Sequence, residues 1–458
     1  MRIIMAFLVA LLSCATPPTE EEAGAAVHTI ISDVNVIDVR QGSVLEHRHV
    51  LIDSGKIVKI LEASNSLPEA DTVISGVGKY LMPGLTEMHA HIPSPEWGRN
   101  LTRETLFLYL SNGVTTIRGM LGHPVHLELR EQAKNNEILS PRIYTASPSL
   151  NGNTVKSREE ARQKVTAYHS DGYDFLKLHP GIELEVFNEI VKTAKELGIP
   201  YAGHVSVNVG IRHALESDYA SVDHVDGFLE GLVPEQADVA PDENGFFGYN
   251  FTQLADTAMI DELVRLADEH GVWVVPTQSL FDRWFSPEDP SILARAPEMK
   301  YMPASTVESW INSKTGLIND DGYQADQWRE FNEIRRKMIY QLHQNGEGLL
   351  LGSDAPQVFN VPGFSIHHEF KGMLDAGLSS AEAIRIGTLN PAIFFEREGD
   401  FGEVVVGGSA DLILLSANPF EDINALKEHE GVMVRGRWLS RAAIEKQLFE
   451  IAENASEM

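Results

Sequence analysis

Cysteine and basic residues are scarce in this chain. Its 458 residues include one cysteine, and 37 Lys and Arg stand against 66 Asp and Glu, so the net charge is −29. A single cysteine excludes an internal disulfide framework and a zinc cluster built from thiolates. The negative charge repels phosphate backbones, so we expect no binding to nucleic acid. A metal site here would have to use His, Asp, Glu or a modified side chain.

Long apolar runs and two common catalytic motifs are also missing. No segment has the roughly 20 consecutive apolar residues of a membrane-spanning helix. The sequence contains neither the G-x-S-x-G elbow of serine hydrolases nor a Walker A loop. The apolar fraction of 43% is nevertheless ordinary for a globular protein, and the length corresponds to two or three domain-sized units.

The first residues are typical of an export signal. Ile3–Leu12 is an apolar run behind Arg2 that is too short to span a bilayer. It runs into Ser13-Cys14, and this resembles a bacterial lipoprotein signal, in which cleavage leaves the cysteine lipid-modified. The alternative is an ordinary signal peptide cut near residues 23–26. Both interpretations predict an exported protein, either periplasmic or anchored in the cell envelope.

The predicted signal, residues 1–14, is followed by a predicted flexible tether at residues 15–27, which contains the acidic stretch TPPTEEE. Because basic residues are few, we expect contact with a membrane only through a lipid on Cys14.

The rest of the chain is predicted to be α/β, with two folded parts. Residues 28–82 and 403–440 contain short β-rich segments separated by Gly and polar turns, which predicts a small β-sandwich domain built from both chain ends. Residues 83–402 alternate strand and helix patterns, as in a (β/α)8 TIM-type barrel. Residues 441–458 are predicted to form a final helix.

Eight segments are predicted as the barrel strands: 85–91, 115–119, 142–147, 175–179, 201–205, 221–225, 272–277 and 349–353. Two connections, 227–258 and 280–347, are too long for plain loops, so we expect them to carry elements of their own. At the C-terminal ends of the strands such connections would shape a pocket.

Ionisable side chains fall in or at the ends of five of these strands. His89 and His91 end the first strand, and residues i and i+2 of a strand point to the same side, so both imidazoles can reach one ion. Four further candidates follow in the fourth, fifth, sixth and eighth strands: Lys177, His204, His224 and Asp354. Each alone is more often a structural residue, but barrel enzymes place catalytic groups at these strand ends.

Together the motifs resemble the amidohydrolase superfamily in its binuclear-metal branch, closest to the prolidase-like and imidazolonepropionase-like group. The resemblance covers nearly all of residues 28–440. The motifs that carry it are MPGLTEMHAH at 82–91, KLH at 177–179, GH at 203–204, DH at 223–224, GSDAP at 352–356, PGFSIH at 362–367 and SADLI at 409–413.

The resemblance implies two divalent metal ions, with zinc expected, and a CO2-derived carbamate on Lys177 that bridges them. The implied ligands are His89, His91 and Asp354 for the first ion, and His204 and His224 for the second. A hydroxide bridging both ions would attack the scissile carbonyl. Asp354 would accept its proton and pass it to the leaving amine.

Substrate specificity is less constrained by these motifs. His179 lies two residues after Lys177, so we expect it either to face the same cavity and contact substrate or to be a surface residue at the strand end. Many relatives carry Gly-Gly-His after the third strand, whereas residues 149–153 read SLNGN. The resemblance therefore implies the metal site of these relatives but not their dipeptidase specificity.

We expect an exported, metal-dependent amidohydrolase that cleaves amide C–N bonds of small molecules, with short peptides such as X-Pro dipeptides, or cyclic amides, as first candidates. A lactonase or organophosphate-type esterase on the same binuclear site is the enzymatic alternative. Arg118 and Arg283 would be weak candidates for binding an anionic substrate. The third alternative is a non-catalytic lipoprotein binding module, although the presence of all six metal-site residues speaks against it. A homo-oligomer stays open, because no stretch specifies an interface.

Overall fold

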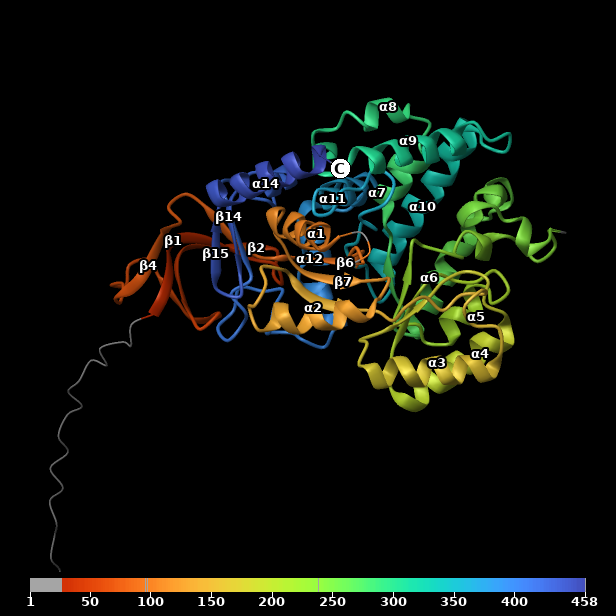
Figure 1. The fold of residues 1–458 in the computed structure, drawn as a ribbon, viewed down its shortest axis with the longest axis horizontal. Helices are drawn as coiled ribbons and strands as arrows, with labels where there is room; N and C mark the ends of the chain where they lie inside the picture. The colour runs from red at the N-terminus through yellow and green to blue at the C-terminus, as the bar shows by residue number, and fades with distance from the viewer. Residues whose placement is uncertain (1–26, 95, 97, 238, 458) are drawn as a thin grey trace, which may run out of the picture.

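The computed structural model describes residues 27–94, 96, 98–237 and 239–457 (Figure 1). The predicted signal, Cys14 as the predicted site of lipid attachment and nearly all of the predicted tether lie outside the described residues. Within the described part of the chain, no helix is both long and apolar enough to cross a membrane.

Strands from the two ends of the chain form one β-sheet, which we call the β domain. Its strands are β1 (Val27–Asp38), β2 (Ser43–Asp53), β3 (Lys56–Glu62), β4 (Ala70–Ser75), β5 (Tyr80–Pro83), β13 (Leu412–Leu415), β14 (His429–Val434) and β15 (Arg437–Ser440). They form one mixed sheet in the order β15-β14-β13-β5-β1-β2-β3, with β4 paired to β1. The predicted sandwich therefore takes the form of one continuous sheet, because β13 pairs antiparallel with β5 and joins the two halves.

This sheet is held by an apolar core and a tight hairpin. Ile31, Val50, Leu81 and Leu412 are buried in one cluster. The β2–β3 turn places Ser54 and Gly55 at φ 48° and 75°, the left-handed backbone that two-residue hairpin turns require. Figure 1 shows the strands from both chain ends side by side, in red and dark blue.

Seven of the eight strands predicted between residues 85 and 353 are present, and all run parallel to their neighbours. They are β6 (Leu85–Ala90), β7 (Val114–Gly119), β8 (Arg142–Thr145), β9 (Leu176–Leu178), β10 (Tyr201–Gly203), β11 (Ser221–Asp223) and β12 (Trp273–Val275). They form a three-stranded sheet, β6-β7-β8, and a four-stranded sheet, β9-β10-β11-β12. Near-continuous burial of these strands fits a parallel sheet covered on both faces.

Single parallel bridges join the first sheet to the second and the second sheet to residue 349. Ala146 bridges Phe175 between the ends of β8 and β9, and Leu349 bridges Val274 of β12. The predicted eighth strand, 349–353, makes only this bridge and no ladder, which corrects the prediction. Its backbone still runs beside β6, because Met88 N donates to Leu351 O at 2.7 Å.

Helices follow most of these strands. Their bounds are α1 (Arg99–Ser111), α2 (Pro124–Lys134), α3 (Arg158–Asp171), α4 (Leu184–Leu197), α5 (Ile211–Glu216), α6 (Ile260–Glu269), α11 (Ser365–Asp375), α12 (Ser380–Gly387) and α13 (Leu389–Phe394). In α4 the buried residues Val186, Ile190 and Ala194 recur every four positions and Gly198 ends the helix at φ 74°, as an amphipathic helix with a glycine stop requires. The predicted C-terminal helix is α14 (Arg441–Ser456).

The two long connections carry elements of their own, as predicted. The first contains the 3-10 turns η2 (Glu230–Leu232), η3 (Pro241–Glu243), η4 (Phe246–Leu254) and η5 (Thr257–Met259). The second begins within the short helix α7 (Gln278–Leu280) and contains the π-helical turn η6 (Phe281–Phe285), α8 (Pro290–Leu293), the 3-10 turn η7 (Pro297–Tyr301), α9 (Ala304–Ile318) and α10 (Ala325–Asn345). A last 3-10 turn, η8 (Ile423–Lys427), precedes β14.

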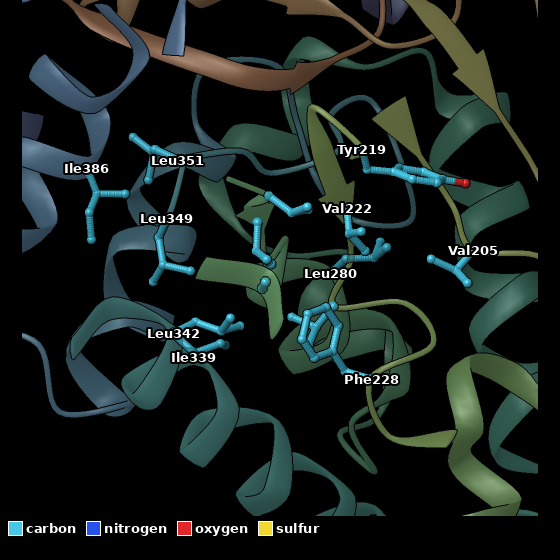
Figure 2. Close-up of a cluster of buried hydrophobic side chains, with 14 of the residues drawn as sticks. Val205, Tyr219, Val222, Phe228, Leu280, Ile339, Leu342, Leu349, Leu351 and Ile386 are labelled. Atoms are coloured by element: carbon cyan, nitrogen blue, oxygen red, sulfur yellow. The ribbon is translucent and has the colours of Figure 1, made fainter. Parts of the chain in front are cut away.

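The main core joins the parallel strands to the helices around them. Figure 2 shows one cluster of buried side chains from several elements. Its members include Leu349, Val222 of β11, Ile339 and Leu342 of α10, and Ile386 of α12. Helix α10, which belongs to the second long connection, is thus part of the core and backs the strand ends.

Candidate metal centre

His89, His91 and Asp354 form a tight cluster at the end of β6. The Nε2 of His91 lies 2.7 Å from Asp354 Oδ1, and the Nε2 of His89 lies 3.4 Å from the same oxygen. One ligand atom from each of the three residues lies within 4.8 Å of the others. The backbone sets this arrangement, since Asp354 N donates to His89 O at 3.0 Å and His91 N donates to Ala355 O at 2.8 Å.

Lys177 and Asp223 lie directly behind this cluster. The Asp223 Oδ2 atom is 3.0 Å from His89 Nδ1 and 3.5 Å from Lys177 Nζ, and both Lys177 and Asp223 are fully buried. Burial lowers the pKa of Lys177. Burial alone would raise the pKa of Asp223, but the charges of Arg118 and Lys177 outweigh it and lower that pKa.

The remaining predicted histidines continue the cluster as a row of rings. The ring centroid of His224 lies 4.6 Å from that of His89 and 4.5 Å from that of His204. His179 stacks on His204 at 5.0 Å. The structure therefore brings all six predicted metal-site residues and His179 to one place.

Hydrogen bonds fix the direction of two of these imidazoles. The Nδ1 of His204 pairs with Asp226 Oδ2 at 2.9 Å, and the Nδ1 of His224 pairs with Thr277 Oγ1 at 2.8 Å. Metal-binding histidines commonly use one ring nitrogen for such a partner and the other for the ion. Asp226 and Thr277 were not predicted from the sequence.

The chemistry of this cluster fits divalent metal ions. Imidazole nitrogens and a carboxylate oxygen are ligands that Zn²⁺ accepts. Within the described residues, the buried atoms Lys177 Nζ, His89 Nδ1 and Asp223 Oδ2 form no hydrogen bond of good geometry, although Asp223 Oδ2 lies near both nitrogens. Buried polar atoms are rarely left unpaired, and such groups call for an explanation such as an ion.

Left-handed backbone recurs around the centre. His224, Thr277 and Asp354 have φ values of 66°, 46° and 62°. Residues other than glycine adopt this conformation at a cost of roughly 1–3 kcal/mol, and such residues gather at functional sites. Three such residues lie at the ends of neighbouring strands or beside them. This indicates that the fold tolerates backbone strain in order to orient these side chains.

Arg118 and Arg283, the two candidates for binding an anionic substrate group, are held by internal contacts. Arg118 is buried and donates to Met88 O at 2.7 Å, Ser221 Oγ at 2.9 Å and Asp223 Oδ1 at 3.1 Å. Arg283 donates to Phe359 O at 3.0 Å and pairs with Glu298 and His368. Both guanidinium groups are therefore committed to internal contacts.

Arg335 of α10 holds the same strand ends from behind. It is 1% exposed and donates to His224 O at 2.7 Å, Pro276 O at 3.0 Å and Gln278 Oε1 at 3.1 Å. Nothing in the local sequence marks this arginine, because its partners lie 57 to 111 residues away.

Glu87 connects the first and last elements of the centre. Its carboxylate accepts from His89 N at 3.1 Å, Ser353 N at 2.7 Å and Ser353 Oγ at 2.7 Å. Burial raises the pKa of Glu87 to about 8. The sequence did not predict that Glu87 binds Ser353, because a glutamate two residues before His89 is indistinguishable from an ordinary strand residue.

Ser149 and Asn151 lie beside the centre although their stretch carries no histidine. Ser149 Oγ pairs with His179 Nδ1 at 2.8 Å, and Asn151 Nδ2 donates to Ser149 Oγ at 2.8 Å. Burial, with the charge of Lys177, lowers the pKa of His179. His179 is half-buried and stacks on His204, so it lies beside the centre and not as an isolated surface residue at the strand end.

Comparisons with known proteins agree with this geometry. Residues 80–439 match the model of the amidohydrolase family. Adenine deaminase of Clostridium perfringens is 28% identical over 34% of this chain and 29% of its own length. Adenine deaminase 3 of Rhizobium meliloti is 23% identical over 89% of this chain and 57% of its own length. The chain thus spans less than two thirds of these relatives.

Solved structures show the same fold. A bottromycin amidohydrolase superposes with a TM-score of 0.71 at 21% identity, over 93% of this chain and 90% of that one. A putative prolidase from Bifidobacterium longum gives 0.67 at 22% identity, over 92% and 98%. A Xaa-Pro dipeptidase with bound methionine gives 0.64 at 19% identity, over 90% and 99%. The match across residues 80–439, with prolidase-like structural neighbours, shows that the chain belongs to the amidohydrolase family.

Proposed function

We propose that the protein is a metal-dependent hydrolase that cleaves amide C–N bonds of small molecules, with short peptides as the first candidates. The observation that carries this proposal is the convergence of His89, His91, Lys177 and Asp354 at one group of strand ends. Membership of the amidohydrolase family and prolidase-like structural neighbours support it.

His89, His91 and Asp354 would hold one divalent ion, and His204 and His224 a second. Ions in such a site supply Lewis acidity and make a water nucleophile available near neutral pH. The chain's own groups prepare the site, because Asp226 and Thr277 occupy the Nδ1 atoms of His204 and His224. The Nε2 atoms of both rings are thereby left for the ion.

Lys177 would join the two ions as a carbamate. Its ammonium group would lose one proton to give the free amine, which would form an N–C bond with CO2 and release a second proton. The cation would thereby become a carbamate whose single negative charge is shared by two oxygens. The support is its full burial and the lack, within the described residues, of a hydrogen-bond partner for Nζ. An ammonium group buried here, with the Asp223 carboxylate 3.5 Å away and no hydrogen bond among the described residues, would be costly.

Asp354 would carry the proton during hydrolysis. Its carboxylate would take a proton from the attacking water and deliver it to the leaving nitrogen, which makes it general base and then general acid. Backbone hydrogen bonds to His89 and the three donors on Glu87 hold the Ser353–Asp354 segment in place for this transfer. His179, oriented by Ser149, would contact the substrate.

Three wider features belong to the same proposal. The two parallel sheets would be parts of one TIM-type barrel, and the bridges Ala146–Phe175, Val274–Leu349 and Ala90–Ala355 support its closure. The domain boundaries predicted from the sequence would hold. The protein would be exported, and the apolar run before Cys14 is the sequence feature that supports this.

The test is a hydrolysis screen of protein that lacks residues 1–14 and has been purified with zinc and bicarbonate. The panel contains X-Pro and other dipeptides, N-acyl amino acids, cyclic amides, lactones and phosphotriesters. We expect activity on amides that is lost in Asp354→Asn. Activity confined to lactones or phosphotriesters would replace the amide assignment with the esterase alternative. Metal-loaded protein without hydrolytic activity would overturn the proposal.

A further inference from the structure

An aromatic surface lies against the histidine row. The ring centroid of Phe247 is 5.8 Å from that of His204 and 5.5 Å from that of His224. Phe247 belongs to η4, in the connection that follows β11, and therefore reaches the centre from the side of the strand ends. A substrate bound at these histidines would meet this ring.

The backbone around Phe247 is held in an uncommon conformation. Phe247 has φ 54° and ψ 40°, and Gly248 follows at φ 78°. A Cβ at Gly248 would lie 2.8 Å from Glu230 Oε2, so only glycine fits there. Glu230 is in turn held by Asn244 Nδ2, which donates to its Oε1 at 2.6 Å. This costly conformation fixes where the phenylalanine ring lies.

Phe247 continues into a larger surface that we call the aromatic wall, defined as Phe246, Phe247, Trp284 and Phe285. The ring of Phe246 lies 4.7 Å from those of Phe247 and Phe285 and 5.2 Å from that of Trp284. Phe246 is 44% exposed, and Trp284 is half-buried. The wall thus runs from the histidine row to solvent.

The second half of the wall has a rigid backing. Lys314, buried on α9, donates from Nζ to Trp284 O at 3.0 Å and to Ser286 O at 2.6 Å. The hydroxyl of Tyr323 donates to Phe285 O at 2.7 Å. Both long connections therefore supply fixed aromatic rings to one surface, and a pre-formed apolar surface binds flat ligands with little ordering cost.

Arg283 precedes Trp284 in the sequence, but its guanidinium group binds Phe359 O and Glu298. It therefore supplies no positive charge to a ligand on the wall. The carboxylates of Glu230 and Asp226 lie behind Gly248 and His204. The Asp226 carboxylate would repel an anionic substrate group on this side, whereas Glu230 contributes less because burial raises its pKa to about 7.

We propose that the aromatic wall is a substrate subsite, and that the substrate carries an uncharged aromatic or similarly flat apolar group within about four bonds of the scissile carbonyl. This inference rests on the proposed function for the position of that carbonyl. Stacking against one fixed ring, together with the apolar area buried, corresponds to about a tenfold gain in binding or in kcat/KM.

The kinetic test compares matched substrates in wild-type protein and Phe246→Ala. Phe246 is partly exposed, so its truncation leaves no buried cavity, and a thermal melt followed by circular dichroism checks the fold. The pairs Phe-Pro against Ala-Pro and Gly-Phe against Gly-Ala place the aromatic group on either side of the scissile bond. We expect one pair to show a kcat/KM ratio of about ten or more in wild type and a clearly lower ratio in the variant, in which Phe247 remains.

The matched control is Phe449→Ala on α14, where the phenylalanine is 67% exposed. This variant should keep the wild-type ratio. A ratio near one in wild type for both pairs, or an equal ratio in wild type and Phe246→Ala, would overturn the subsite.

A binding measurement separates this inference from the proposed function. Ligand-observed NMR compares benzamide with acetamide, which differ in an aromatic ring one bond from the carbonyl. We expect benzamide to bind about tenfold more tightly to wild type and to lose much of this advantage in Phe246→Ala. That result in protein without hydrolytic activity would retain the wall and reject the hydrolase. Hydrolysis of amides without any preference for benzamide would retain the hydrolase and reject the aromatic wall as a subsite.

Discussion

The Nε2 of His91 and the Oδ1 of Asp354 lie 2.7 Å apart, although 263 positions separate the two residues in the chain. Backbone hydrogen bonds between β6 and residues 351–355 bring them together. The same oxygen lies 3.4 Å from His89, so one carboxylate is shared by both imidazoles of the HAH motif. This geometry underlies the assignment of Asp354 as both a metal ligand and a proton carrier.

Asp354→Asn should reduce kcat/KM on the best amide substrate by at least about 100-fold, because the amide cannot accept and return a proton. Steady-state kinetics on protein of known metal content measures this loss. The control is Asp71→Asn in the β domain, whose side chain is 76% exposed. An Asp354→Asn variant that retains its metals and more than a tenth of wild-type activity would contradict the proton-carrier role.

Arg118→Met should destabilise the fold by about 3–5 kcal/mol, the usual cost of removing one partner of a buried ion pair. Arg118 and Asp223 are both fully buried, and Asp223 would lose its strongest hydrogen-bond donor. Urea unfolding at pH 7 measures the change, with exposed Arg437→Met as the control. A loss below about 1 kcal/mol, the range of exposed pairs, would show that Arg118 is not needed to hold Asp223.

Glu369 should make stability fall as pH rises. Burial raises the pKa of this α11 carboxyl from 4.5 to about 7, although it accepts from Gln278 N and Ser279 N. A raised carboxyl pKa favours the folded state below the unfolded value, and this contribution is lost as pH rises through the folded value. Relative to wild type, Glu369→Gln should gain up to about 3 kcal/mol between pH 4.5 and 7.

Urea unfolding at several pH values between 4.5 and 8 tests this difference. Glu196→Gln, at an exposed position of α4, supplies the control and should show no such trend. A constant difference between Glu369→Gln and wild type over the whole range would mean that Glu369 ionises normally in the folded protein.

His179→Ala should lower kcat/KM by about tenfold while the metal content stays at the wild-type level, because one hydrogen bond to substrate is lost. Ser149→Ala should have a smaller effect in the same direction, since it only frees the ring that Ser149 Oγ orients. His169→Ala, exposed on α3, is the control. Metal loss in His179→Ala would instead make His179 part of the ligand set.

Local sequence signals predicted part of the candidate site. The HAH spacing predicts two imidazoles on one side of a strand; β6 ends at Ala90, and the Nε2 atoms of His89 and His91 lie 3.4 and 2.7 Å from the same oxygen of Asp354. Seven predicted strands are present within a few residues of their expected bounds. The eighth predicted strand does not form a ladder. Its apolar residues are typical of a strand, but its backbone runs beside β6 and makes only separate hydrogen bonds with it.

The supporting residues could not be found in the same way. Arg335 and Phe247 reach the centre from the two long connections, and the partners of Arg335 lie up to 111 residues away. Glu87 faces the loop before Asp354 across 266 positions. Such contacts depend on tertiary packing, whereas sequence periodicity reports only on the local element. The β domain likewise needed the β5–β13 pairing to be seen as one sheet.

The metal content of the protein tests the central claim most directly. Protein lacking residues 1–14 would be purified with zinc and bicarbonate beside Lys177→Ala, and both would be analysed by elemental mass spectrometry. The binuclear, carbamate-bridged centre predicts close to two ions per chain in wild type and a sharp fall in Lys177→Ala. Equal metal content in both would show that Lys177 is a bystander, and well-folded wild-type protein without metal would contradict the metal centre altogether.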